Sequence, residues 1–210
     1  LAKEYDTALE VFGWLERNRP DYIRGWLVKG NTLLACGRTD DAIAAYSEAT
    51  RLDPNSARAW CDLGAALATS GKLADAEAAF KKSIATGVVL PEASYNLGLS
   101  LARTQRNREA VAWLRKSLET SPRQAIALGT LARCYMELGR FAEAIEHMRT
   151  HAEVEPGSAE VWADLAFSLS ICWDWEPALA AARKAIDLDA NSIEAHYVAG
   201  SALFRTGRFE

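Results

Sequence analysis

Three side chains of the segment 143–151 have a spacing that suits metal ligands. Glu143, His147 and His151 lie four residues apart, so a helix would present all three along one face. They do not form the HExxH pattern of a metalloprotease, and no other histidine or cysteine can be placed beside them from the sequence. We therefore expect histidines that are packed or exposed, and no metal.

Other patterns that carry catalysis are also missing from the sequence. Gly64 and Gly71–Lys72 bear only a faint likeness to a phosphate-binding loop, because the glycine spacing is wrong and the segment belongs to a helix. Neither Gly-x-Ser-x-Gly nor the Gly-x-Gly-x-x-Gly of dinucleotide-binding folds occurs. We expect a protein that is not an enzyme and that takes no cofactor.

Composition restricts the class of partner. The 210 residues are 50% hydrophobic and 25% charged with a net charge of −4, which is ordinary for a globular protein and argues against nucleic acid. No apolar run approaches the roughly 20 residues of a membrane-spanning helix, so we expect no membrane association. The cysteines form no CxxC pair, which favours reduced thiols and a cytoplasmic location, with a bacterial periplasm as the alternative; they are Cys36, Cys61, Cys134 and Cys172.

The elements that must position any site follow from an internal repeat. Small residues recur every 34 residues, in one series at Gly30, Gly64, Gly98, Ala132, Ala166 and Gly200. A second series with the same period runs through Ala8, Ala42, Ala76, Ala110, Ala144 and Ala178. A fixed period of this length predicts a stack of small helical repeats that share one core and present one long surface.

In this register we expect residues 1–210 to form a single array. Its complete repeats would be 23–56, 57–90, 91–124, 125–158 and 159–192. Residues 1–22 would supply the second helix of a partial repeat, and 193–210 the first helix of another. Because neither end shows a polar capping helix, we expect the array to be a fragment of a longer chain.

The repeat 57–90 illustrates how the sequence would build two helices. Ser56 can cap the first helix by accepting bonds from its free N–H groups, and the helix carries one apolar face, formed by Trp60, Leu63, Gly64 and Leu67. Gly71 ends it, since glycine tolerates the left-handed conformation. The second helix carries a matching face, formed by Leu73, Ala76, Phe80 and Ser83. We expect the small residues to let the two helices approach closely, and Trp60 and Phe80 to fill the space between neighbouring repeats.

These residues resemble the tetratricopeptide repeat (TPR). The resemblance rests on Trp60-x2-Leu63-Gly64-x2-Leu67, on Ala76-x3-Phe80, and on Pro54 at the end of the previous repeat. It covers the whole chain. It implies an all-α fold, a right-handed α-solenoid of antiparallel helix pairs (a TPR superhelix), in which the first helix of each repeat lines a concave groove for a peptide or a partner protein.

The resemblance also implies which residues face the groove. They are Asp62, Tyr95, Asn96, Leu99, Thr130, Arg133, Asp164 and Phe167. Together they would give a polar centre with apolar surface around Tyr95, Leu99 and Phe167, which suits an extended peptide or a helix. The alternative is a solvated helix face without a ligand. Binding of a chaperone tail is not expected, because Asp62 and Glu92 stand where that variant of the family needs an amide and a cation.

Two turns between helices depart from the repeat, because Gln105 and Trp173 replace the usual glycine. Around Trp173, two tryptophans and two acids share one turn. One interpretation is a contact for a partner, since exposed tryptophan is enriched at interfaces. The other is that Trp175 fills the aromatic place that Phe141 and Phe209 hold in other repeats, which leaves only Trp173 unexplained.

Three hypotheses for function follow. The first is a protein–protein interaction scaffold that binds a peptide or a partner protein in its groove and performs no chemistry. The second is the non-catalytic recognition arm of a larger enzyme, such as a glycosyltransferase or sulfotransferase with these repeats. The third is self-association through the uncapped ends, since an exposed end of a solenoid offers an apolar face to a second copy.

Overall fold

The described part of the chain is built from α-helices. A computed structural model describes residues 2–207, and for residues 2–6, 8 and 9 it describes the backbone alone. Over this range the chain forms helices and no strand, which confirms the all-α prediction. The helices are α1 (Ala2–Asn18), α2 (Ile23–Ala35), α3 (Thr39–Leu52), α4 (Ala57–Thr69), α5 (Leu73–Ala85), α6 (Pro91–Arg103), α7 (Asn107–Thr120), α8 (Ala125–Glu137), α9 (Phe141–Val154), α10 (Ala159–Ile171), α11 (Trp175–Leu188) and α12 (Ile193–Thr206).

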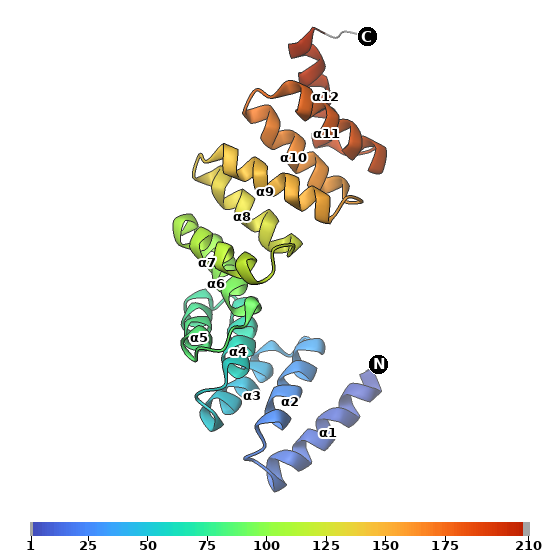
Figure 1. The fold of residues 1–210 in the computed structure, drawn as a ribbon. Helices are drawn as coiled ribbons and strands as arrows, with labels where there is room; N and C mark the ends of the chain where they lie inside the picture. Colours follow the sequence, from blue (N-terminus) through green and yellow to red (C-terminus); the bar gives the residue numbers. More distant parts are fainter. Residues whose placement is uncertain (1, 208–210) are drawn as a thin grey trace. The chain divides into compact units, whose positions relative to one another are not determined.

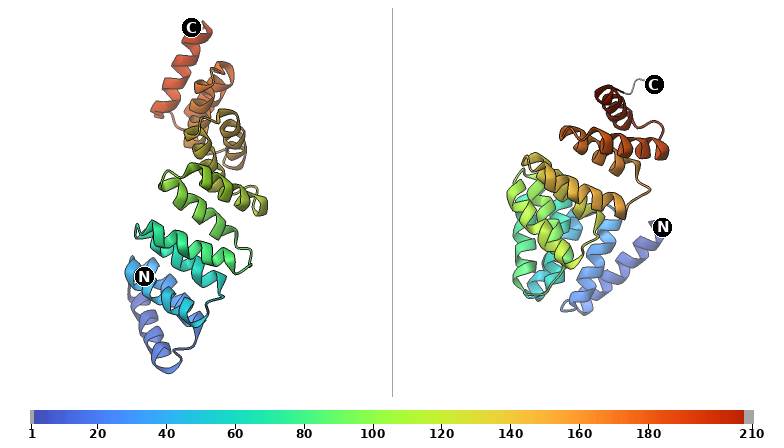
Figure 2. Two further views of the ribbon diagram at one scale, coloured as in Figure 1. Left: turned by 90° about the vertical axis from the view of Figure 1, so that its left-hand side faces the viewer. Right: turned by 45° about the horizontal axis from the view of Figure 1, so that its top comes forward.

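The helices divide into two compact units, Leu1–Thr104 and Gln105–Glu210. The first holds α1 to α6 and the second α7 to α12 (Figure 1). Within each unit consecutive helices pack as antiparallel pairs, such as α4 with α5 and α10 with α11 (Figure 2). The first helices of successive pairs also contact one another, α4 with α6 and α10 with α12. Each unit is therefore a short stack of helical hairpins.

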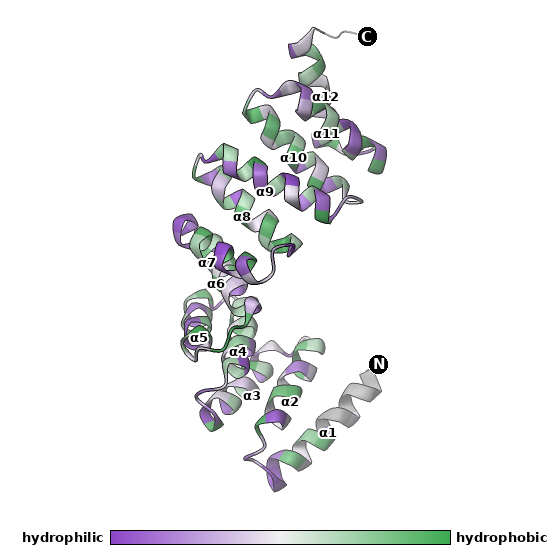
Figure 3. Ribbon diagram, viewed as in Figure 1, coloured by the Kyte–Doolittle hydropathy of each residue, from purple (hydrophilic) through white to green (hydrophobic). Residues whose placement is uncertain are grey.

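Most of the described helices have one apolar and one polar face. In both units hydrophobic and hydrophilic segments alternate along the ribbon of the helices (Figure 3). This periodicity is what a helix needs in order to pack on neighbours with one face and meet water with the other. Among residues 2–207, no helix is both long enough and apolar enough to cross a membrane.

Hydrogen bonds join the start of the first helix of a repeat to the segment before it. Trp60 shows the arrangement: its indole N–H donates to the carbonyl of Pro54 at 2.8 Å, and the Lys82 ammonium lies 4.1 Å from its ring centre. The hydroxyl of Ser56 caps the same helix by accepting from the N–H of Ala59 at 3.3 Å. The indole bond recurs one repeat earlier and three repeats later, at Trp26–Pro20 (2.9 Å) and Trp162–Pro156 (3.0 Å).

In the first unit, glycine on one helix accommodates an aromatic ring from the next. A Cβ built on Gly64 would lie 2.6 Å from Cε1 of Phe80, and a Cβ on Gly30 would meet the ring of Tyr46 as closely. Phe80 is 0% exposed and Tyr46 is 1% exposed. The close approach of paired helices that the small residues predicted is therefore present at both positions.

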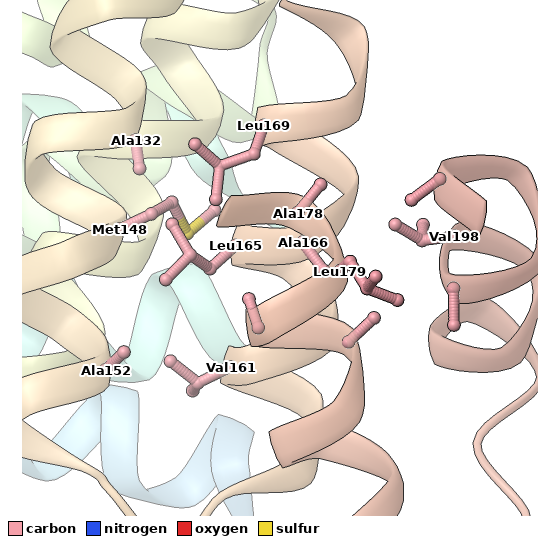
Figure 4. Packing of buried hydrophobic residues seen from close by; sticks show 14 residues of the cluster. Ala132, Met148, Ala152, Val161, Leu165, Ala166, Leu169, Ala178, Leu179 and Val198 are labelled. Atoms are coloured by element: carbon pink, nitrogen blue, oxygen red, sulfur yellow. The ribbon is translucent and has the colours of Figure 1, made fainter. Parts of the chain in front are cut away.

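The second unit packs around a cluster of aliphatic side chains with alanines between them. Met148 of α9 lies against Leu165 of α10, and on the far side of α10 Leu179 of α11 faces Val198 of α12 (Figure 4). None of these four is more than 6% exposed. Burial of a side chain of this size stabilises a fold by about 1.5–3 kcal/mol. The cluster therefore fixes how α8 to α12 stack, and with them any site between α8 and α10.

Two non-glycine residues adopt the left-handed backbone conformation that glycine adopts in the equivalent turns of other repeats. Gly37, Gly71 and Gly139 have φ of 74°, 82° and 71°, and Gln105 and Trp173 have φ of 60° and 63°. A Cβ disfavours this left-handed region, because it approaches the following carbonyl oxygen. The turns at Gln105 and Trp173 are therefore strained relative to the glycine turns.

The two tryptophans of the second turn have different surroundings. Trp175 is partly buried and packs against the core of the second unit, whereas Trp173 is 66% exposed. Their rings meet edge to face, with centroids 5.7 Å apart, and the Arg205 guanidinium lies 5.1 Å from the Trp173 ring centre. The packing supports the structural interpretation for Trp175 and leaves Trp173 at the surface. Phe209, which entered that interpretation, lies outside the described residues.

Removing the strain at Gln105 should stabilise the fold. We expect Gln105→Gly to raise the free energy of unfolding by about 1 kcal/mol, because glycine has no Cβ to clash at this φ. The reverse change at an equivalent turn, Gly71→Gln, should lower it by a similar amount. Urea denaturation of both variants beside the wild type measures the two shifts. Shifts of the same sign in the two variants would contradict the account.

Candidate functional site

The second unit contains a pocket between the first helices of two successive pairs. It has a volume of about 450 Å³ and lies between α8 and α10, with the end of α9 forming its floor. Four residues that were predicted to face the groove line it together, namely Thr130, Arg133, Asp164 and Phe167. We call this hollow the α8/α10 pocket.

The four predicted residues contribute differently to this pocket. Thr130 is 4% exposed, and its hydroxyl donates to the carbonyl of Ile126 at 2.8 Å. It therefore forms part of the pocket wall and has little hydrogen-bonding capacity left for a partner. Phe167 is 47% exposed, which is high for a ring of this size. Arg133 is exposed, and no ion pair holds it within residues 2–207. Arg133 and Phe167 are therefore available to a ligand.

Among the acidic groups that line the pocket, Asp164 has a shifted pKa. The residue is exposed at the rim, yet the surrounding walls desolvate its carboxyl and raise the carboxyl's pKa above the ordinary value. The nearby Glu160 raises this pKa further, while His151 and Arg133 lower it. A carboxylate that is partly desolvated and has no partner in the described structure gains most from a ligand that donates hydrogen bonds or carries positive charge.

At the floor of the pocket, the large side chain of His151 packs against Gly129, which has none. A Cβ on Gly129 would lie 2.9 Å from Cε1 of His151, so the imidazole uses the space that the glycine leaves. The His151 side chain is 13% exposed, and its Nε2 lies 3.4 Å from a carboxylate oxygen of Glu155. In the same register, the other complete repeats have alanine or serine in place of His151, and all the other repeats have a larger residue in place of Gly129. His151 therefore belongs to the pocket.

The sequence interpretation did not place His151 in the groove. It rejected His151 as a metal ligand and expected a histidine that is packed or exposed, without assigning it to the groove. The signal that could have found it is the pairing of a histidine at that place with Gly129 across the hairpin. His147, in contrast, stacks on Tyr135 with ring centroids 5.6 Å apart, and burial lowers its pKa. Within residues 2–207, no group of three or more His, Cys, Asp or Glu side chains is arranged to hold a metal ion.

The first unit contains a smaller pocket between α4 and α6, of about 190 Å³. Asn96 and Leu99, both predicted for the groove, line it, and the Arg103 guanidinium closes one end by donating to the carbonyl of Ala68 at 3.2 Å. On α4, burial raises the pKa of the Cys61 thiol to about 11. This hollow is the α4/α6 pocket.

The two remaining predicted residues lie outside the lining of the α4/α6 pocket. Asp62 is engaged within its own helix, because the Arg58 guanidinium donates to its carboxylate at 2.9 Å. Burial raises the pKa of Asp62, and Arg58 opposes that rise. Tyr95 is partly buried on α6. The structure therefore brings together four predicted residues in the second unit and two in the first.

The raised pKa of Asp164 gives stability a specific pH dependence. The folded state holds the Asp164 proton more tightly than the unfolded chain, so this residue's contribution to stability falls as pH rises through the raised pKa. We expect Asp164→Asn, which is neutral at every pH, to be more stable than the wild type at pH 7. That advantage should shrink as pH falls toward about 3.9, the ordinary pKa of aspartate. Urea denaturation at pH 7, 5 and 4 tests this, and an advantage that grows on acidification would contradict it.

The chain resembles known proteins over most of its length. Residues 1–150 match the family model described as the cilia and flagella-associated protein 70 C-terminal domain. No curated protein matches the sequence significantly. Among solved structures, the chain is similar to YrrB, a TPR protein with an unusual peptide-binding site, at 22% identity and a TM-score of 0.76, covering 89% of this chain and 96% of that one.

Two further structures have the same arrangement. PilW, a widely conserved type IV pilus biogenesis factor, is 20% identical with a TM-score of 0.78, covering 94% of this chain and 91% of that one. MamA from Desulfovibrio magneticus RS-1 is 21% identical with a TM-score of 0.74, covering 81% and 97%. At these identities the likeness concerns the fold, an all-α solenoid of helix pairs.

Proposed function

The chain belongs to the tetratricopeptide-repeat family, which includes the C-terminal domain of cilia and flagella-associated protein 70, and we propose that it is a protein-interaction scaffold. Its ligand is an extended segment of a partner protein, which binds along the first helices and enters the α8/α10 pocket. The observation that carries the proposal is that Arg133, Asp164 and Phe167 line one pocket. Within the described residues, the side chains of Arg133 and Asp164 make no ion pair or hydrogen bond, and the ring of Phe167 is exposed.

The chemistry of the α8/α10 pocket fits a peptide. An extended main chain presents carbonyl oxygens and N–H groups, and Arg133 can donate to the former while Asp164 accepts from the latter. Phe167 offers apolar surface for one side chain of the segment. The likeness to YrrB, which has a peptide-binding site of its own, supports this reading. No reaction is assigned to the chain in this proposal.

Selection from a peptide library tests the proposal. Phage-displayed random peptides of twelve residues would be selected on the whole chain, and a selected peptide would be measured by fluorescence anisotropy. We expect Phe167→Ala to weaken its binding about tenfold, because an exposed aromatic that lines a pocket can serve as an anchor.

The matched control is Phe204→Ala on α12. Phe204 is 67% exposed in the same unit and does not line the α8/α10 pocket, so its removal should leave binding unchanged. Equal loss of affinity in both variants, or no loss in either, would overturn the proposal.

A further inference from the structure

The ionisable groups of the α8/α10 pocket are mostly acidic. Glu155, Glu160 and Asp164 line it beside a single guanidinium, that of Arg133, so its net charge is −2 when His151 is neutral. A carboxylate oxygen of Glu155 lies 3.4 Å from Nε2 of His151, which pairs with it when the imidazole is protonated. Within the described residues, the carboxylates of Glu160 and Asp164 make no ion pair or hydrogen bond. The lining of the pocket is therefore net negative, and Glu160 and Asp164 are its two carboxylates without an ion pair among the described residues.

These two carboxylates stand on one face of α10. Residues four apart are neighbours on a helix, and two like charges in this relation repel each other. Burial raises the pKa of Asp164 most, and the repulsion from Glu160 raises it further. A cation placed between the two carboxylates would relieve this repulsion.

Apolar surface lies next to the acidic part of the pocket. Phe167 follows Asp164 by three residues on the same face of α10 and is 47% exposed. Ile126 of α8 is 64% exposed and lines the same hollow. If a cationic side chain of a ligand binds the carboxylates, the next side chain of that ligand can pack on this apolar surface.

This charge pattern is not repeated in the α4/α6 pocket. Its lining contains no carboxylate and includes the cationic Arg103. The net negative hollow is therefore a property of the α8/α10 pocket, and it can contribute to the choice of partner by charge complementarity.

We infer, on the basis of the proposed function, that the α8/α10 pocket selects a partner segment in which a lysine or arginine stands next to a large apolar residue. The cation binds between Glu160 and Asp164, and the apolar side chain packs on Phe167 and Ile126. Arg133 donates to a main-chain carbonyl of the segment. His151 forms the floor beneath them.

The test uses the whole chain and the random twelve-residue peptides displayed on phage. Selection on the wild type should enrich peptides with lysine or arginine beside an apolar residue. The variant Glu160→Gln/Asp164→Asn keeps the shape of both side chains and removes both charges. It should bind a selected peptide about tenfold more weakly or worse, because charge-assisted hydrogen bonds are lost. Circular dichroism would confirm that the variant is folded.

A control variant separates the pocket from the overall charge. Glu146→Gln/Asp187→Asn removes two exposed carboxylates that do not line the pocket, and it should bind the peptide as the wild type does. The inference is overturned, with the proposed function intact, if Phe167→Ala weakens binding while the selected peptides lack basic residues or the pocket variant binds normally. If Phe167→Ala has no effect, the proposed function fails and the inference fails with it.

Discussion

Replacing Gly64 by alanine should destabilise the first unit by about 1–3 kcal/mol, the usual cost of overpacking a well-filled core. The added Cβ would lie 2.6 Å from Cε1 and 2.7 Å from Cδ1 of Phe80. Phe80 is 0% exposed, so its ring has no solvent to move into and must shift against packed neighbours. The clash exceeds the gain of about 1 kcal/mol that alanine normally brings to the interior of a helix.

Gly200 provides a matched control, because it has the same place in the repeat on α12. A Cβ there would meet no atom within 4 Å. Gly200→Ala should therefore be neutral or stabilise by up to about 1 kcal/mol through helix propensity alone. Guanidinium denaturation followed by far-UV circular dichroism would measure both variants. Destabilisation of the two variants by the same amount would show that the Phe80 ring is not the cause.

Phe80→Ala should have the largest effect of the single substitutions considered, a loss of about 3–5 kcal/mol in the free energy of unfolding. The ring is fully buried, and its removal leaves a cavity beside Gly64 that the helix backbones cannot close. Phe167→Ala is the appropriate comparison, since Phe167 is 47% exposed and its loss should change stability by no more than about 0.5 kcal/mol.

The two substitutions should also interact. In a Phe80→Ala background the Cβ added by Gly64→Ala no longer meets a ring, so its cost should largely disappear and the double variant should be close in stability to Phe80→Ala alone. The cycle is measured with the same denaturation experiment. Strictly additive losses would mean that Gly64 and Phe80 do not form the contact described above.

The packing within repeats could be predicted from the sequence because it depends on local spacing. The small residue Gly64 predicted a close approach of the paired helices, and Ser56 was expected to cap the helix that it does cap. The contact of Phe80 with Gly64 was not predicted, because Phe80 was expected to lie between neighbouring repeats. The polar role of Trp60 was not predicted. Its indole bond to Pro54 joins residues six apart across a helix start, and a pattern of apolar residues does not reveal hydrogen-bond partners.

The site was predictable in outline and not in detail. Register predicted six residues that line the two pockets. Two side chains of equivalent register nevertheless have different surroundings, because Asp62 pairs with Arg58, whereas Asp164 has no partner within residues 2–207. That difference depends on which neighbour stands one turn earlier, Arg58 in one repeat and Glu160 in the other. His151 escaped prediction because its position depends on a residue across the hairpin.

Mapping where a ligand contacts the protein tests the central claim, that the chain is a scaffold whose α8/α10 pocket receives a partner segment. A peptide selected on the chain would be titrated into ¹⁵N-labelled protein, and the amide shifts followed by NMR. We predict that the largest shifts fall on residues 126–136 of α8 and 160–168 of α10, including the amides of Arg133 and Phe167. Largest shifts on α11 and α12, or on helices of the first unit alone, would contradict the claim.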